Sequence, residues 1–587
     1  MVTKTSEKKL AIIGVGPRGL SALEQFYHTL MQRNHQIKIT TTLFETSENL
    51  GSGSVWNINQ PNSNWLNISE RALQNLKGRP EIKIKEISIP AFPSYTHWLP
   101  ENERELPNKS PDRFPPRNKL GHYLHERFDT IAKPLLAHDL ISIKKTQIER
   151  IDFNQEEFAL YDCEGLIETF DEVVLTIGHQ PTELSSQLKK FKEHSQNKAQ
   201  IVFYDEPYPV TRIIENSQIS SESTVAIRGF GLAMIDVMRA LTIERGGSFK
   251  TLDKKTLACN YAPSESTPRK IVPFSLDGLP LAPKPHSSEI DEQYKPTEQE
   301  ITNFKQIVSE AASGKRNVSG NDFLKNAIAK IAARVYNDLG ASRYDMGTDI
   351  EELKEVAIKW LDDEHFQHKT LLSTKMETID IIERYVNMAL NLTPISLDYC
   401  IGQIWHHCQP SWYEAFSHAD MNDDDIAKTI ALHERLKRFS YGPPVESMQQ
   451  ILALIRAGVL DLDFLSDPEI NITKDGWLIK KNDNSVSTNI MINSVLDAPK
   501  LLKVISPIII DLLKKDYVEP VHSELGIETN ANGLIKSSEK NEPIIPLAIL
   551  GRLAKGSVVG VDAILECFGE RITNWAEGAV FRLTSNK

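Results

Sequence analysis

A glycine-rich turn near the N-terminus constrains the fold of this chain more than any other sequence feature. An apolar run from Leu10 to Ile13 leads into the sequence Gly-Val-Gly-Pro-Arg-Gly at residues 14–19. Beyond the turn, apolar side chains recur at a helical spacing, at Leu20, Leu23, Tyr27 and Leu30. A G-x-G-x-x-G turn between a strand and a helix is typical of dinucleotide-binding sites, because the glycines admit a pyrophosphate and the helix N-terminus favours its charge.

The acidic residue that such a site requires is Glu45, which ends a second β-branched segment at residues 37–44. A carboxylate at this place accepts hydrogen bonds from an adenosine ribose. Glu45 lies somewhat farther along the chain than the acidic residue of NAD-binding folds. We therefore predict an FAD site that uses Gly14, Gly16, Pro17, Arg18, Gly19 and Glu45. A strand–turn–helix with incidental glycines is the alternative.

The composition argues against several other classes of protein. At 587 residues the chain is too long for a single core, and its net charge of −12 argues against nucleic-acid binding. Five cysteines without a C-x-x-C pair indicate a reducing compartment rather than a disulfide scaffold. Because no signal peptide or membrane-spanning segment is evident, we expect a cytoplasmic protein without a membrane partner.

Changes in the hydrophobic pattern divide the chain. Strand-like and helical segments alternate as far as a proline-rich connection, helical spacing dominates from about residue 298, and strand-like segments return after about residue 460. We predict an α/β fold, in which a Rossmann-like FAD-binding domain is joined by a second dinucleotide-binding domain and a mostly helical insertion. The expected parts are the N-terminal part of the FAD-binding domain (1–200), an NAD(P)H-binding region (201–297), a helical insertion or lid (298–459), and a C-terminal part that completes the FAD-binding core (460–587).

A second glycine turn follows the apolar segment at residues 223–228. Gly229, Gly231 and Leu232 open a helical segment, but Met234 stands where a third glycine is usual, so the motif is weak by itself. In a chain that already carries an FAD turn, it indicates a nicotinamide nucleotide site. A structural β–α crossover is the alternative. Nearby cations could favour the 2′-phosphate of NADPH, namely Arg228, Arg239 and Arg245.

Two further loops are expected to lie beside the cofactors. The loop after the second strand contains Gly53 and Trp56 and leads to Asn67, and such small and aromatic residues suit a loop that approaches an aromatic ring. Another strand ends at Gly178 and His179, where backbone could approach a cofactor. Packing under the sheet is the alternative for the first loop and an ordinary strand end is the alternative for the second, and we expect no catalytic role for His179.

Metal binding is not expected. The sequence His-His-Cys at 406–408 lacks a partner pair at ligand spacing. The acidic run that begins at Asp420 lacks the glycine and the glutamate of a calcium loop. We therefore assign no metal site.

Several motifs together resemble a bacterial family of FAD/NAD(P)-binding flavoproteins with two dinucleotide sites. The matching segments are residues 14–21, 51–56, 113–117, 121–124, 171–181 and 225–236. The resemblance is strongest over residues 8–290 and continues more weakly through Gly442-Pro443 and a closing segment from Leu550 to Trp575. Members with an assigned activity are flavin-dependent amine N-monooxygenases, such as the nitrosuccinate synthases, which oxidise the amino group of aspartate.

The resemblance implies FAD and NADPH as cofactors and O₂ as a co-substrate. NADPH would reduce FAD, O₂ would add at flavin C4a, and the hydroperoxide would transfer oxygen to the unprotonated nitrogen of a small amine or amino acid. The closing segment adds Gly551 to the residues expected at the cofactors, which are Gly14, Gly16, Gly19, Glu45, Trp56, Asn67, Gly178, Gly229 and Gly231. Thr176-Ile177 replaces an expected Ala-Thr, and Ser275-Leu276 replaces an expected Ser-Arg, so we do not carry over an aspartate site.

No catalytic acid–base pair is evident, because the cofactor would carry the hard chemistry. A substrate carboxylate would be held by a basic residue, and the residues to test are Arg71, Arg113, Arg117, Lys284 and Arg343. Two other functions stay open: an NAD(P)H-dependent flavin reductase or oxidase, and a non-catalytic FAD-binding partner protein. The helical insertion could be a lid or the interface of a homo-oligomer, and the sequence does not choose between them.

Overall fold

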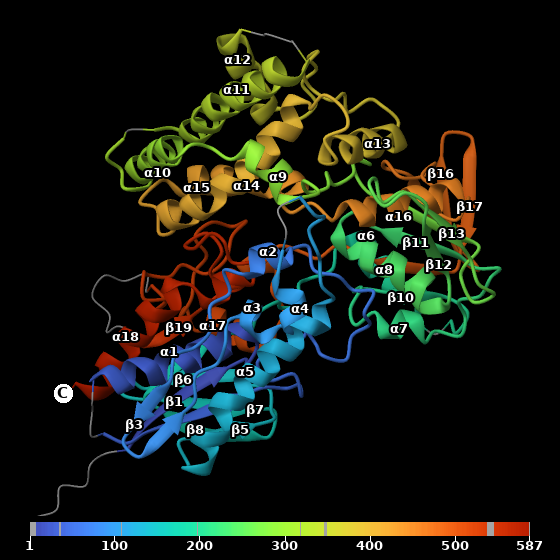
Figure 1. Cartoon of the computed structure of the whole chain (residues 1–587). Helices are drawn as coiled ribbons and strands as arrows, with labels where there is room; N and C mark the ends of the chain where they lie inside the picture. Colours follow the sequence, from blue (N-terminus) through green and yellow to red (C-terminus); the bar gives the residue numbers. More distant parts are fainter. Residues whose placement is uncertain are drawn as a thin grey trace, which may run out of the picture.

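The computed structural model describes residues 7–33, 37–106, 109–196, 198–316, 318–344, 349–536 and 545–585, and only the backbone of residues 341–344. The chain forms an α/β fold with two parallel sheets and a mostly helical region (Figure 1). The first sheet lies at the lower left of Figure 1, the second at the right at mid-height, and helices from the middle of the chain lie at the top. Among the described residues, no helix combines the length and apolar character needed to cross a bilayer.

The first sheet contains strands from both ends of the chain. Its order is β19 (Leu547–Ile549), β9 (Glu172–Leu175), β1 (Lys8–Ile13), β2 (Ile39–Phe44) and β5 (Ile141–Lys144), and all neighbours are parallel. Ile13 pairs with Phe44 on one side and with Leu175 on the other. The carboxyl ends of the three central strands therefore meet at one edge of the sheet, and the loops that follow them start side by side.

Helices cover one face of the first sheet. That face packs against α1 (Pro17–Arg33), α5 (Arg117–Ala137) and α18 (Glu570–Thr584). The opposite face packs against α17 (Pro507–Lys514) and a small antiparallel sheet of β6 (Arg150–Phe153), β7 (Phe158–Asp162) and β8 (Gly165–Phe170). Alternate residues of β1 belong to the two cores, Leu10 and Ile12 to the first and Ala11 and Ile13 to the second. A strand buried on both faces requires such a continuous apolar run.

The second sheet has the order β10 (Val202–Tyr204), β18 (Ile490–Asn493), β11 (Thr224–Arg228) and β14 (Lys270–Phe274), again all parallel. The helix α8 (Leu232–Thr242) follows β11 directly. The face opposite α8 packs against α6 (Ser186–Ser195) and the antiparallel strands β15 (Glu469–Thr473), β16 (Gly476–Lys481) and β17 (Asn484–Thr488). A two-stranded ribbon, β12 (Ser248–Thr251) with β13 (Cys259–Ala262), follows α8 in the chain.

The helical region shares one hydrophobic core with the second sheet. Its helices are α10 (Glu298–Ala312), α11 (Asp322–Tyr344), α12 (Ile350–Asp362), α13 (Thr378–Ala389), α14 (Leu397–Phe416), α15 (Asp423–Ser440) and α16 (Val445–Arg456). Side chains of α8 such as Met234 and Met238 lie in the same core as Trp405 of α14. Most side chains of α8 are apolar and every residue from Ala233 to Thr242 is buried, because the helices of the insertion cover the helix.

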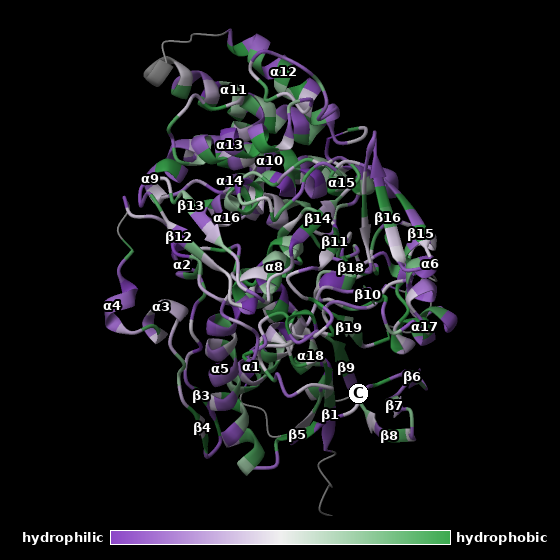
Figure 2. Ribbon diagram, turned by 90° about the vertical axis from the view of Figure 1, so that its right-hand side faces the viewer, coloured by the Kyte–Doolittle hydropathy of each residue, from purple (hydrophilic) through white to green (hydrophobic). Residues whose placement is uncertain are grey.

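Short elements connect these larger units. They are α2 (Glu70–Leu73), β3 (Ile82–Ile84), β4 (Ile87–Ile89), α3 (Tyr95–Trp98), α4 (Glu101–Arg104), α7 (Thr211–Ile214) and α9 (Ser288–Asp291). Figure 2 shows α4 at the edge of the molecule in the colour of hydrophilic residues, and α4 buries none of its side chains. In the chain, the segment with α2, α3 and α4 lies between β2 and β5 of the first sheet, and α2 carries the predicted site residue Arg71.

The structure divides the C-terminal part differently from our expectation. Residues 460–587 were expected to complete the FAD-binding core, and among the described residues of this part β19 lies in the first sheet whereas β18 lies in the second. Parallel strands need long crossover connections, so a strand can be separated from its neighbours by a whole helical region. The four domain boundaries otherwise stay predictions.

Candidate functional site

The first glycine turn lies where the central strands of the first sheet end. The Val15 N–H donates a hydrogen bond to Glu45 Oε2 at 2.9 Å, so the carboxylate lies against the turn. The Thr176 hydroxyl, at the end of β9, donates to the Gly14 carbonyl. The parallel register therefore brings together the turn, the acidic residue and the end of a third strand, which are separate in the sequence.

The three glycines of the turn meet different steric demands. Gly14 has φ +92°, and a Cβ there would lie 2.9 Å from backbone atoms of Ile177. A Cβ on Gly19 would lie 2.2 Å from the Gly14 carbonyl oxygen. A Cβ on Gly16 would meet nothing nearer than the Gly53 Cα, at 3.7 Å. Gly14 and Gly19 are needed for the turn itself, whereas Gly16 leaves open space at the N-terminus of α1, which fits the pyrophosphate of a dinucleotide.

Most of the other residues predicted at the FAD site lie around this turn. Gly53 lies against Gly16 and Pro17. Gly551 packs against the side chain of Arg18, whose Nη2 donates to the Val561 carbonyl at 2.8 Å. The sequence distance between Arg18 and Gly551 is large, and the first sheet brings them together because β19 is one of its strands.

Gly178 and His179 follow β9 at the same edge of the sheet. Both residues are exposed. Gly178 has φ +65°, and a Cβ there would meet no atom within 4 Å. Trp56 differs, because it packs against the core below α5, and its carbonyl would lie 1.9 Å from a Cβ on Gly121.

The second glycine turn leads into α8. Gly229 has φ +114°, and a Cβ there would lie 2.6 Å from Ser494 Oγ. Gly231 precedes the helix as its N-cap, and a Cβ there would meet nothing within 4 Å. Leu232 is the first residue of the helix. Like Gly16, Gly231 leaves open space at a helix N-terminus, which fits a second phosphate group.

The three cations near this turn have different surroundings. Arg228 Nη1 donates to Asn493 Oδ1 at 3.0 Å. Arg245 closes the helix and donates to backbone carbonyls, among them that of Ile214 at 2.7 Å. Arg239 is only 2% exposed. Since Arg239 lies inside the protein, a role for it at a 2′-phosphate stays a prediction.

A pocket lies where the two dinucleotide-binding regions meet, with about 260 Å³ of space including its open mouth. Asn67 and Trp65 line it from the first region and Leu232 and Arg239 from α8, and the turn at Pro443-Pro444 before α16 closes it. The Asn67 Nδ2 donates to the Tyr441 carbonyl at 3.4 Å. This junction is a usual place for a ligand site, because side chains from independent elements converge there.

Arg117 is the predicted substrate residue that lines this pocket. Its Nη2 lies 2.6 Å from Asp236 Oδ2, and its Nη1 donates to the Tyr208 hydroxyl at 3.2 Å. The Tyr208 hydroxyl in turn donates to Asp236 Oδ2 at 2.6 Å. Although burial lowers the pKa of Arg117, the charge of Asp236 raises it overall. Arg117 is thus already neutralised by a carboxylate.

The remaining substrate candidates lie elsewhere. Arg71 is held by Asp112 at 2.7 Å and by Asp291 at 3.1 Å. Arg113 pairs with Glu70 at 2.8 Å outside the pocket. The side chain of Arg343 lies outside the described residues. The structure therefore does not gather these cations around one binding site.

Lys284 belongs to the neighbourhood of Arg71. Its Nζ donates to the Ser440 carbonyl at 3.2 Å, at the C-terminal end of α15, and its backbone N–H donates to the Pro443 carbonyl at 3.0 Å. Burial lowers the pKa of Lys284 to about 8, although Asp291 and Asp112 raise it.

This depressed pKa predicts a pH-dependent stability. Because the unfolded chain holds the Lys284 proton more tightly than the folded protein, the free energy of unfolding should rise between pH 8 and pH 10.5. Lys284→Met should remove that rise, and urea unfolding of both proteins across this range measures it. Lys250→Met, at an exposed position of β12, is the control. Parallel pH profiles for the parent protein and Lys284→Met would contradict the prediction.

Sequence reasoning did not single out Tyr208 and Asp236, and it assigned Arg239 to a different site. One signal was present: Asp236 and Arg239 are the only charged residues of α8, and every residue from Ala233 to Thr242 is buried. Charged side chains are rarely buried unless they are paired or bind a ligand. Two charged residues in an otherwise apolar helix therefore indicate a polar site, either functional or structural.

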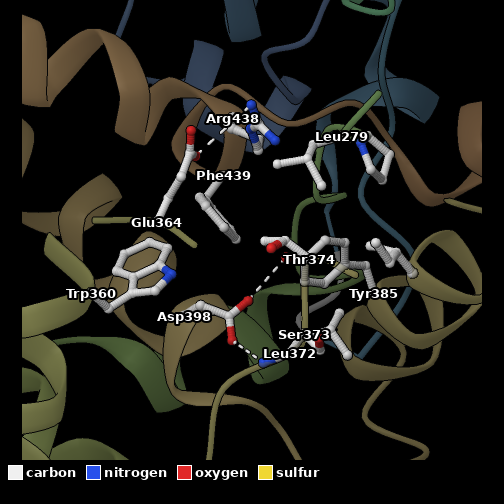
Figure 3. Close-up of a pocket in the computed structure, with 12 residues that line it drawn as sticks. Leu279, Trp360, Glu364, Leu372, Ser373, Thr374, Tyr385, Asp398, Arg438 and Phe439 are labelled. Atoms are coloured by element: carbon white, nitrogen blue, oxygen red, sulfur yellow. Dashed lines mark hydrogen bonds and ion pairs between the residues drawn. The ribbon is translucent and has the colours of Figure 1, made fainter. Parts of the chain in front are cut away.

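A second cavity lies in the helical region (Figure 3), lined among others by Trp360, Tyr385, Asp398 and Arg438. Asp398 accepts hydrogen bonds from the Leu372 N–H and from the Tyr385 hydroxyl, each at 2.9 Å. Burial raises the pKa of Asp398. None of the predicted site residues lines this cavity, and its carboxylate has local partners. We therefore assign it to the packing of the helices. In the described part of the chain, no three His, Cys, Asp or Glu side chains gather as metal ligands.

Comparison with known proteins supports the cofactor class. A family model described as FAD-NAD(P)-binding matches residues 11–180. The chain is 26% identical to a nitrosuccinic acid synthase of Aspergillus oryzae over 271 residues, which cover 45% of this chain and 39% of the relative. It is 25% identical to a nitrosuccinate-forming L-aspartate N-monooxygenase of Streptomyces cremeus over 368 residues, which cover 57% of this chain and 52% of the relative. The chain thus spans about half or less of these curated relatives, and the resemblance to N-monooxygenases is confirmed at this level.

Solved structures of cyclohexanone monooxygenase align with the chain over most of its length. The epsilon-caprolactone-bound enzyme is 10% identical, with a TM-score of 0.44, and the alignment covers 98% of this chain and 88% of that one. A mutant enzyme from Rhodococcus sp. Phi1 bound to NADP⁺ is 10% identical, with a TM-score of 0.42 and coverages of 98% and 86%.

Proposed function

We propose that the protein is an FAD- and NADPH-dependent monooxygenase that N-hydroxylates a small amine or amino acid. The observation that carries this proposal is the pocket at the junction of the two glycine-turn regions, with Asn67 on one side and the start of α8 on the other. A site between two dinucleotides suits electron transfer from one to the other followed by reaction with a third molecule. In the overall reaction the amine, O₂, NADPH and a proton form the hydroxylamine, water and NADP⁺.

The residues of the first turn would hold FAD. Open space at Gly16 admits the pyrophosphate, and the Glu45 carboxylate lies beside the turn, where it can accept hydrogen bonds from a ribose. The open N-terminus of α8 at Gly231 would take a phosphate of NADPH. Bound FAD supplies the electron transfer and the activation of oxygen, so the chain itself must bind the amine, orient it and exclude water.

The pocket suits that task. Its walls combine apolar surface, from Leu66, Ile235 and the two prolines before α16, with a few fixed polar groups. Asp236 is held by Arg117 and Tyr208, so its carboxylate is already engaged by hydrogen bonds and an ion pair. The amine must therefore enter unprotonated or lose its proton to solvent.

The relatives named for L-aspartate do not decide the substrate of this chain. Leu276 stands where the resemblance leads us to expect an arginine, and Leu276 is 85% exposed. An exposed leucine cannot hold a carboxylate. We therefore propose a small amine or amino acid as the substrate class and do not transfer aspartate.

Product analysis under ¹⁸O₂ tests the proposal. The FAD-loaded protein is given NADPH and a panel of small amines and amino acids, and NADPH consumption, hydrogen peroxide and hydroxylamine are measured. We expect one class of amine to yield one ¹⁸O-labelled hydroxylamine per NADPH. NADPH oxidation that produces only hydrogen peroxide with every amine would indicate a reductase or oxidase instead. A protein whose FAD is not reduced by NADPH would indicate a non-catalytic FAD-binding protein.

A further inference from the structure

Arg239 is a buried cation with an unusual set of partners. It is 2% exposed, and its guanidinium carbon lies 3.8 Å from the centre of the Trp65 ring. Its Nε donates to Gln450 Oε1 at 2.9 Å and its Nη2 donates to Ser447 Oγ at 2.7 Å. Within the described residues, Nη1 makes no hydrogen bond and no carboxylate lies within ion-pair distance of the guanidinium. Arg239 nevertheless lines the pocket at the junction.

Three other arginines with little exposure each contact a carboxylate. Arg127 and Arg79 share the carboxylate of Glu24, at 2.7 and 3.0 Å, and Arg117 pairs with Asp236. A buried charge without a partner is costly, because water no longer solvates it. Burial lowers the pKa of Arg239 to about 10, so the side chain stays protonated at neutral pH.

Two carboxylates lie near Arg239, but in the described part of the chain neither contacts its guanidinium. Asp236, on the same helix, is engaged by Arg117 and by the Tyr208 hydroxyl. Glu446, at the start of α16, makes no ion pair with Arg239, although the charges of Asp236 and Glu446 both raise the pKa of Arg239. The Nη1 group of Arg239, whose guanidinium carbon lies over the Trp65 ring, is therefore left for an anion.

We propose that Arg239 binds the carboxylate of the substrate, and that the pocket selects amines that carry a single carboxylate. A guanidinium presents parallel N–H groups that match a carboxylate. A second carboxylate would find only Arg117, which Asp236 already neutralises. The carboxylate would lie against α8 and direct the amine group toward the Asn67 side of the pocket. This assignment rests on the proposed function, but binding of the carboxylate can be measured without turnover.

Isothermal titration calorimetry without NADPH tests the assignment on the FAD-loaded protein. The probes are glycine, β-alanine and 4-aminobutyrate, which carry one carboxylate, together with L-aspartate, which carries two, and n-propylamine, which carries none. We expect at least one monocarboxylate amine to bind about 10-fold or more tighter than L-aspartate and n-propylamine, as the loss of a hydrogen bond to a charged group implies. Failure of all three monocarboxylates to bind, or equal binding of n-propylamine, would overturn the proposal.

Three variants assign the effect to Arg239. Arg239→Lys keeps the charge but loses the planar pair of donors, and it should weaken binding about 10-fold or more. Ser447→Ala and Gln450→Met remove the hydrogen bonds that hold the guanidinium, and each should weaken binding less than Arg239→Lys does. These two variants keep the test available if Arg239→Lys does not fold. Arg435→Lys is the matched control, because Arg435 is a part-buried guanidinium that donates to backbone carbonyls of the helical region.

Two further outcomes separate the alternatives. Unchanged carboxylate affinity in Arg239→Lys with a shifted reduction potential of bound FAD would overturn the proposal, since Arg239 would then serve the cofactor. Tight, Arg239-dependent binding of a monocarboxylate amine without formation of a hydroxylamine would overturn the proposed function and leave the anion site in place.

Discussion

Gly16→Ala should give a folded protein that does not retain FAD. A Cβ at Gly16 would lie 3.7 Å from the nearest atom, Gly53 Cα, which is an ordinary van der Waals distance. The same Cβ would occupy the space that a pyrophosphate needs at the N-terminus of α1. We therefore expect a melting temperature close to that of the parent protein, together with loss of the flavin absorbance per mole of purified protein.

Gly19→Ala should fail in a different way. A Cβ there would lie 2.2 Å from the Gly14 carbonyl oxygen, so the backbone of the turn must move. Overpacking of this kind costs about 1–3 kcal/mol or more, and the variant should lose stability as well as FAD. Gly569→Ala is the control, because a Cβ at that position would come no closer than 3.7 Å to the Glu566 carbonyl.

Thermal unfolding of the apoproteins and FAD titration measure the two effects. If Gly16→Ala binds FAD as tightly as the parent protein, the pyrophosphate does not approach this turn and the assigned FAD site is wrong. If Gly19→Ala matches the parent in stability, the turn is not constrained as the structure describes.

Glu24→Gln should destabilise the protein by about 3–5 kcal/mol, the usual consequence of breaking a buried ion pair. Glu24 Oε1 lies 3.0 Å from Arg79 Nη1, and Glu24 Oε2 lies 2.7 Å from Arg127 Nη2. The side chains of all three residues are at most 4% exposed. A neutral amide would leave two buried guanidinium groups without a carboxylate. Because the site is buried, few water molecules could solvate these charges in place of the carboxylate.

Urea unfolding of the apoprotein measures this loss, and Glu414→Gln provides the comparison. Glu414 pairs with Lys305 on the surface, with a side chain that is 64% exposed, and surface pairs of this kind contribute little. Equal midpoints for Glu24→Gln and Glu414→Gln would contradict the prediction. Since Glu24 lies on α1, the variant should also bind FAD more weakly, because the same helix presents the glycine turn.

The first dinucleotide site was largely predictable because its parts are local or follow from parallel pairing. The turn, its flanking strand and its helix occupy neighbouring residues, and Glu45 ends the next strand. Gly551 is different, since it reaches Arg18 only through β19 at the edge of the first sheet. A family resemblance suggested this residue, and no local pattern near it would have done so.

The partners of the candidate substrate cations could not be predicted from the sequence, and the reason is physical. A sequence shows that a side chain is basic but does not show which carboxylate faces it. Arg71 and Arg113 each have acidic partners outside the pocket, and Arg117 faces Asp236 of another region. Arg239 was expected at a phosphate, whereas it stacks on Trp65.

Glycine spacing and hydrophobic periodicity, which report backbone conformation and burial within a few residues, were sufficient to predict the α/β class, both glycine turns and the helical insertion. The docking of segments far apart in the chain decided the rest: the place of β18 in the second sheet, the core shared by α8 and the helical region, and the pocket with its unpaired guanidinium. Which charged side chains face one another across such an interface depends on how whole layers pack. The sequence therefore does not show that Arg239 lacks a contacting carboxylate in the pocket.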